Sequence, residues 1–319
     1  MARVLGPSVT VAPALPANLT YAGRQVTLKY HKLLSGLGRH PPNSLAALRE
    51  VLDGGAAAIE FDIQPLADGD YALLHDGRLE SETTGFGAVD RTVTRALKAL
   101  RLRGSDEPPT TLSEVAAVLA SHRAPLKVQV DCKEQRPWSE ADARRLLKAL
   151  EPIRRNPHLR VVVGCLADWN LRLLRRLDPT VVVGLDFMLY LDSPVDDAIR
   201  LPTRVNAYGY LDDHPVGYRR ALPVADYLAD RVESLSMMVA GAEEFYLRKE
   251  FILQALGDGF NPVVFLRERL GRPVVIDAWT VNAHHPGARD ELEAVLRAGV
   301  DQITTDTATA LAALAEGLG

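Results

Sequence analysis

Two acidic side chains stand near the end of an apolar run in this chain, as Glu60 and Asp62 within residues 58–63. A β-strand places alternate side chains on opposite faces, so these two carboxylates share one face. The run 128–133 repeats the arrangement, with Asp131 and Lys133 on a common face. An ion pair with Arg or Lys would explain either pattern alone. Both patterns together predict a metal site of Glu60, Asp62 and Asp131, whose oxygen donors favour Mg²⁺ or Ca²⁺.

Two histidines follow strand-like runs and could face the same site. His31 ends the first run and His75 ends a short later one, so the pair is suited to general acid and general base catalysis. Lys32 and Lys133 would place positive charge beside the metal, as the non-bridging oxygens of a phosphodiester require. Trp279 would supply an aromatic wall for an apolar part of the substrate, or it packs in the core.

Apolar runs alternate with helical patterns along the chain. Strands are predicted over 25–31, 57–64, 126–133, 159–166, 180–187, 234–241, 273–281 and 302–306. Helices are predicted over 43–54, 111–120, 139–150, 168–177, 244–256 and 289–298. This alternation predicts an α/β protein with a (β/α)8 TIM barrel, whose catalytic groups stand at the C-terminal ends of the strands. An open doubly wound sheet is the alternative, weakened because no glycine-rich dinucleotide fingerprint follows the first strand.

The pattern divides the chain into an N-terminal arm, 1–24, and a single barrel domain, 25–319. An insertion over about 65–110 follows the second strand and contains a short extra strand over 71–75. The segment 194–230 has weak periodicity and would form a lid or an irregular crossover.

Composition excludes several classes of protein. The 319 residues carry 37 basic and 41 acidic side chains, which argues against binding of nucleic acid through bulk charge. No signal-type apolar stretch or transmembrane segment is found, so we expect a soluble, cytoplasmic protein. Cys132 and Cys165 lie in apolar runs and are predicted to be buried thiols. The oligomeric state is not determined by the sequence.

The same residues resemble the motifs of the glycerophosphodiester phosphodiesterase family. Its His-Arg-Gly and Pro-Glu-Asn-Thr segments are similar to residues 31–33 and 41–44, and its Glu-x-Asp and His-Asp pairs match residues 60–62 and 75–76. Later segments similar to family motifs lie at 83–87, 109–115, 131–133, 279–282 and 299–306. The series covers 26–135 strongly and 273 to the end moderately.

The resemblance implies a TIM barrel with a small insertion after the second strand. It also implies that Glu60, Asp62 and Asp131 bind a divalent cation and that His31 and His75 form the acid–base pair. The chain departs from the family at Lys32, where an arginine is usual, and at Pro42, which replaces a glutamate. Asp131 replaces a glutamate, in which the chain is similar to the distantly related sphingomyelinase D enzymes.

We therefore expect metal-dependent hydrolysis of a small-molecule glycerophosphodiester to an alcohol and a glycerol phosphate. Two alternatives remain open. One is a phospholipase D-like lyase that leaves a cyclic phosphate, and the other is a phosphate-ester-binding relative with weak or no catalysis.

Overall fold

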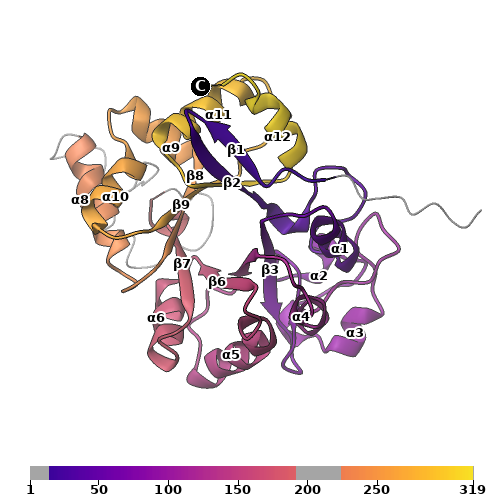
Figure 1. The fold of residues 1–319 in the computed structure, drawn as a ribbon. Helices are drawn as coiled ribbons and strands as arrows, with labels where there is room; N and C mark the ends of the chain where they lie inside the picture. The colour runs from indigo at the N-terminus through magenta and orange to yellow at the C-terminus, as the bar shows by residue number, and fades with distance from the viewer. Residues whose placement is uncertain (1–13, 192–223, 319) are drawn as a thin grey trace, which may run out of the picture.

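Eight parallel strands close into a barrel. The computed structural model describes residues 14–191 and 224–318. The sheet runs in the order β2, β10, β9, β8, β7, β6, β5, β3, and pairing between β2 and β3 closes it. Figure 1 looks into this ring of strands, with helices arranged around its outside. The predicted (β/α)8 barrel is confirmed, and the open doubly wound sheet is excluded.

The strands and helices follow one another in the order expected for this fold. The barrel strands are Arg24–Tyr30 (β2), Ala58–Pro65 (β3), Leu126–Cys132 (β5), Leu159–Cys165 (β6), Val182–Asp186 (β7), Glu244–Arg248 (β8), Val275–Trp279 (β9) and Gln302–Thr305 (β10). Asn18–Tyr21 (β1) and Tyr71–Ala72 (β4) pair antiparallel with β2 and β3. The helices are Leu45–Asp53 (α1), Leu79–Glu82 (α2), Thr94–Lys98 (α3), Leu112–Ala120 (α4), Glu140–Arg154 (α5), Asp168–Leu177 (α6), Met188–Leu191 (α7), Val224–Ser236 (α8), Lys249–Gly257 (α9), Pro262–Leu270 (α10), Ala288–Ala298 (α11) and Ala308–Ala315 (α12), with 3-10 turns at His31–Leu33 (η1) and Val89–Arg91 (η2).

Side-chain caps fix the start of the helices next to the site. Ser44 Oγ accepts a hydrogen bond from the Ala47 N–H at 3.1 Å, which begins α1 directly after the loop that carries Asn43. Thr111 and Glu114 form a capping box at the start of α4. Both caps set where a loop of the C-terminal barrel face ends.

The insertion after β3 folds against its own small core. The hairpin of β3 and β4 is followed by α2, η2 and α3, whose apolar side chains form a cluster separate from the main core. Figure 1 shows α2 and α3 beside α4, on one side of the barrel. Of the predicted arm 1–24, residues 18–21 form β1 and pair with β2. Residues 194–223 of the segment 194–230 lie outside the described part of the chain.

One predicted strand is wrong. The range 234–241 begins in the last turn of α8, and the barrel strand in this region is Glu244–Arg248, within the predicted helix 244–256. Glu244 and Tyr246 point toward the barrel interior, where Glu244 accepts a hydrogen bond from Lys127 at 2.8 Å. The hydrophobicity pattern does not indicate this strand, because its inward-facing residues are polar and the apolar residues Phe245 and Leu247 alone do not make a continuous run.

The barrel interior is polar where TIM barrels usually hold branched apolar side chains. Lys29 is buried and pairs with Asp277 at 3.1 Å, and its ammonium lies 4.5 Å from the centre of the Tyr246 ring. Tyr246 on β8 fits because Gly184 on the neighbouring β7 and Gly164 on β6 have no side chain where its ring lies. A Cβ added at Gly184 would overlap the Tyr246 hydroxyl and ring.

We therefore expect Gly184→Ala to lower the free energy of unfolding by about 1–3 kcal/mol, since the added methyl group overpacks the interior. Urea denaturation of the two proteins measures the difference. Gly257→Ala is the matched control, because a Cβ there meets no atom within 4 Å and helix α9 would gain a better helix former. Equal unfolding midpoints for Gly184→Ala and wild type would contradict this packing.

Two further expectations concern the cysteines and the membrane. Cys132 and Cys165 are free and buried, as predicted. None of the helices in the described ranges is long and apolar enough to cross a membrane.

Candidate active site

A cavity of about 400 Å³ opens among the C-terminal ends of the barrel strands. Six of the predicted site residues line it, namely His31, Glu60, His75, Asp131, Lys133 and Trp279. Asp62 is fully buried, and Lys32 is not among the lining residues. The structure thus brings most of the predicted residues to one pocket, from the strands β2, β3, β5 and β9 and the loops that follow them.

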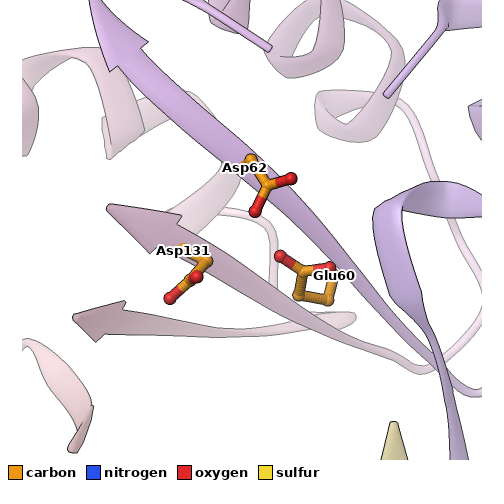
Figure 2. A group of neighbouring side chains, drawn as sticks. All are labelled: Glu60, Asp62 and Asp131. Atoms are coloured by element: carbon orange, nitrogen blue, oxygen red, sulfur yellow. The ribbon is translucent and has the colours of Figure 1, made fainter. Parts of the chain in front are cut away.

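Three carboxylates converge beside this cavity. Asp62 on β3 and Asp131 on β5 are partners in the parallel register, and Glu60 lies two positions before Asp62. One carboxylate oxygen from each residue lies within 4.8 Å of the others. Figure 2 shows the three side chains on two adjacent strands, with Glu60 and Asp62 on the same strand. This is the cluster that the alternating pattern predicted.

Neighbouring groups hold these carboxylates in place. The Asn43 side-chain amide donates to Asp62 Oδ2 at 2.9 Å, and the Asp62 N–H donates to Asn43 Oδ1 at 3.2 Å. The Lys32 backbone N–H donates to Glu60 Oε2 at 2.8 Å. Lys133 Nζ lies 2.9 Å from Asp62 Oδ1 and 2.5 Å from Asp131 Oδ2.

The charges of this cluster are not balanced by Lys133 alone. Burial, together with the charge of the nearby Asp62, raises the pKa of Glu60 to about 7. Burial also opposes ionisation of Asp62, but the Lys133 ammonium holds the pKa of that carboxyl well below its usual range. One ammonium against three carboxylates leaves two negative charges in excess when all are ionised. Oxygen donors with excess negative charge fit a hard divalent cation.

His31 is oriented by a carboxylate that sequence reasoning did not assign to the site. Its Nδ1 lies 2.7 Å from Asp306 Oδ1, and Asn282 donates to Asp306 Oδ2 at 2.7 Å. Burial lowers the pKa of His31, but the hydrogen bond to Asp306 and the charge of Glu60 outweigh it, so the pKa is raised. With Nδ1 held, Nε2 is 3.9 Å from Glu60 Oε2.

His75 is held by the insertion. Its Nδ1 lies 2.8 Å from Asp76 Oδ1, and Gln64 donates to its backbone carbonyl at 3.0 Å. The backbone N–H groups of His75 and Asp76 both donate to Glu82 Oε1, at 2.8 and 2.9 Å. The side chain is 44% exposed, so the imidazole is accessible from the cavity mouth.

The remaining predicted residues differ in position. Lys133 lines the cavity next to the carboxylates, and Trp279 lines it from the end of β9, where the sequence placed it. Lys32 has left-handed backbone torsions, and it contacts the cluster through its backbone N–H. Its charge nevertheless contributes, after that of Lys133, to lowering the pKa of Asp62.

Three supporting residues were not predicted to belong to the site. They are Asn43, Glu82 and Asp306, which contact Asp62, the His75 loop and His31. Asp306 carried a signal, because it is a carboxylate directly after a strand, at the barrel face where the other acids stand. Glu82 carried none, since its contact depends on how the insertion folds back.

Comparison with known proteins gives a consistent class. The family model described as the glycerophosphoryl diester phosphodiesterase family matches residues 36–310. A glycerophosphodiester phosphodiesterase of Caldanaerobacter subterraneus is 25% identical over 167 residues, which cover 50% of this chain and 67% of that protein. Human glycerophosphodiester phosphodiesterase 1 is 33% identical over 90 residues, which cover 26% of this chain and 27% of the human protein.

A solved structure has the same fold. It is an Oleispira antarctica phosphodiesterase in complex with the product sn-glycerol-3-phosphate, with a TM-score of 0.60 and 16% identity, covering 91% of this chain and 96% of that one. The chain belongs to the glycerophosphoryl diester phosphodiesterase family, a family of phosphoric diester hydrolases.

Proposed function

We propose that this protein hydrolyses glycerophosphodiesters to an alcohol and a glycerol phosphate in a reaction that requires a divalent cation. The observation that carries the proposal is the cluster of Glu60, Asp62 and Asp131 in the same pocket as His31 and His75. Membership of the family and the likeness to relatives named for this reaction support it.

Glu60, Asp62 and Asp131 would hold the cation. When bound, it would neutralise charge on the phosphate oxygens and lower the pKa of the attacking hydroxyl. Asn43 and the Lys32 N–H orient two of the three carboxylates, so these side chains are positioned before ligands arrive. Lys133 adds a positive charge at the cavity wall, where it would stabilise negative charge that develops on the phosphate.

The two imidazoles divide the proton transfers. One accepts the proton of the attacking hydroxyl, and the other donates a proton to the departing alkoxide, which is too basic to leave unprotonated. Each Nδ1 is held by a carboxylate, of Asp306 for His31 and of Asp76 for His75. Each ring therefore keeps Nε2 for the reaction, and the carboxylate stabilises the imidazolium form.

Turnover measurements with restored cations test this function. Purified protein is treated with a chelator and then assayed for alcohol release from glycerophosphocholine and from lysophospholipids, with Mg²⁺, Ca²⁺ or Mn²⁺ added back. We expect release that the chelator abolishes and at least one cation restores, because without the cation the cluster carries excess negative charge that repels a phosphodiester anion. Equal release with and without chelator would contradict the cation requirement.

A further inference from the structure

His75 lies on a loop, whereas His31 directly follows a barrel strand. The strand β4 ends at Ala72, and the Leu73 N–H donates to the Thr110 carbonyl at 2.9 Å. The chain then leaves the sheet, and His75 lines the cavity with its side chain 44% exposed. The sheet therefore does not fix the position of this imidazole, and other contacts must do so.

Two side chains hold the backbone at His75 from opposite sides. Gln64 Nε2 donates to the His75 carbonyl at 3.0 Å. Glu82 Oε1 accepts from the N–H groups of His75 and Asp76, at 2.8 and 2.9 Å. Gln64 belongs to the barrel strand β3, and Glu82 belongs to α2 of the insertion. Gln64 and Glu82 thus form a clamp that holds this loop between the barrel and the insertion.

Gln64 connects His75 to the strand that carries two of the clustered carboxylates. Glu60, Asp62 and Gln64 alternate along β3, so their side chains share one face of the strand. All three side chains are buried, and Gln64 also lines the cavity. One strand therefore presents both the carboxylates and the amide that holds the His75 carbonyl. This arrangement gives the imidazole a defined place relative to the carboxylate cluster.

Glu82 completes the clamp from the insertion. Within residues 14–191 and 224–318 no basic side chain forms a salt bridge with it, and its carboxylate accepts from the two backbone N–H groups instead. Burial raises the pKa of Glu82, and the hydrogen bond from the Asp76 N–H opposes this rise. Hydrogen bonds to an ionised carboxylate are about twice as strong as those between neutral groups. The half-buried carboxylate is therefore a firm anchor for the backbone at His75.

We propose that Gln64 and Glu82 are positioning residues for His75, and that their clamp keeps the imidazole Nε2 where proton transfer at the carboxylate cluster requires it. This inference rests on the proposed function for the role of His75. Asp76 holds Nδ1 and so fixes the rotation of the ring, but Asp76 belongs to the same loop and moves with it. A displacement of about 1 Å can lower a rate about a hundredfold, so the position of the loop matters as much as the rotation of the ring.

Steady-state turnover of glycerophosphocholine tests this role. Glu82→Ala should lower kcat by about tenfold or more and leave KM within about twofold, because substrate still binds but the proton transfer is misaligned. Gln64→Leu should lower kcat to a similar extent. Glu82→Gln keeps an oxygen for both N–H groups, so its kcat should stay within about threefold of wild type. Glu80→Ala is the matched control, with kcat within about twofold of wild type, because Glu80 lies on the same helix but accepts from the Gly87 N–H.

A double variant separates positioning from general damage to the fold. Adding Glu82→Ala to His75→Ala should change the residual turnover by less than about twofold, because the imidazole that Glu82 positions is already absent. A further loss of about tenfold in the double variant would overturn the proposal, since Glu82 would then act on something other than His75. Wild-type kcat in Glu82→Ala, or an equal loss in Glu82→Gln and Glu82→Ala, would also overturn it.

Hydrogen exchange of the His75 and Asp76 amides measures the clamp without turnover. Exchange should be faster in Glu82→Ala than in wild type and Glu80→Ala, because the two N–H groups lose their acceptor. Unchanged exchange in Glu82→Ala would overturn the clamp. Faster exchange together with no turnover by wild type would instead overturn the proposed function and leave the clamp standing.

Discussion

Glu60→Gln is expected to lower cation-dependent turnover by about a thousandfold or more, because the variant loses one charged ligand of the cluster. Glu60 is buried, and one of its carboxylate oxygens lies within 4.8 Å of a carboxylate oxygen of Asp62 and of Asp131. Its Oε2 accepts a hydrogen bond from the Lys32 N–H. Glutamine has the same shape as glutamate, so the substitution changes the charge of the site and not its shape. Loss of the Glu60 charge also reduces the excess negative charge of the cluster, so the variant should bind a divalent cation more weakly. Calorimetric titration with Mn²⁺ and the alcohol-release assay measure the two effects separately.

Glu151→Gln serves as the control for that variant. Glu151 lies on the surface of α5 and pairs with Arg155 one turn later, and exposed pairs of this kind contribute little to stability. It should therefore bind Mn²⁺ and turn over substrate as wild type does. If Glu60→Gln bound Mn²⁺ with wild-type affinity, Glu60 would not be a ligand.

The second large effect concerns the histidines. We expect His31→Ala and His75→Ala each to lower turnover of glycerophosphocholine by about a hundredfold or more, since each removes one proton transfer. A glycerol p-nitrophenyl phosphodiester separates the two roles, because p-nitrophenolate leaves without a proton. One variant should recover much of its activity with this substrate, and that variant lacks the general acid.

His122→Ala is the matched control for both histidine variants. His122 precedes β5 and so lies at the opposite end of the barrel from the cavity, where its backbone carbonyl accepts from Asn156. Its loss should leave turnover within about twofold of wild type, since no proton transfer depends on it. Near-normal turnover in both His31→Ala and His75→Ala would refute the acid–base assignment.

Sequence reasoning predicted the barrel and the carboxylate cluster because both depend on local regularities. Alternation along a strand puts Glu60 and Asp62 on one face, and parallel pairing of neighbouring strands then places Asp131 opposite Asp62. The Thr111 and Glu114 capping box is equally local. Such features can be predicted from sequence because they depend only on residues nearby in the chain or on the adjacent strand.

The supporting contacts could not be predicted in this way. Asp306 reaches His31 across 275 positions, through closure of the barrel between β10 and β2. The wrong strand prediction at 234–241 has a related cause. The true strand carries the polar residues Glu244 and Tyr246 on its inward face, where Lys127 pairs with Glu244 and glycines on other strands leave space for Tyr246. Long-range polar pairing is absent from a hydrophobicity pattern, and this chain uses it at the barrel centre.

Phosphorus NMR of glycerophosphocholine incubated with the protein tests most directly whether the pocket is a cation-dependent phosphodiesterase. With Mg²⁺ or Ca²⁺ present, the diester signal should be replaced by that of a phosphate monoester, and Glu60→Gln or excess chelator should leave the diester unchanged. A cyclic phosphate as the final product would contradict hydrolysis and favour a lyase. Persistence of the diester under every cation, with the ligand bound, would contradict catalysis and favour a binding protein.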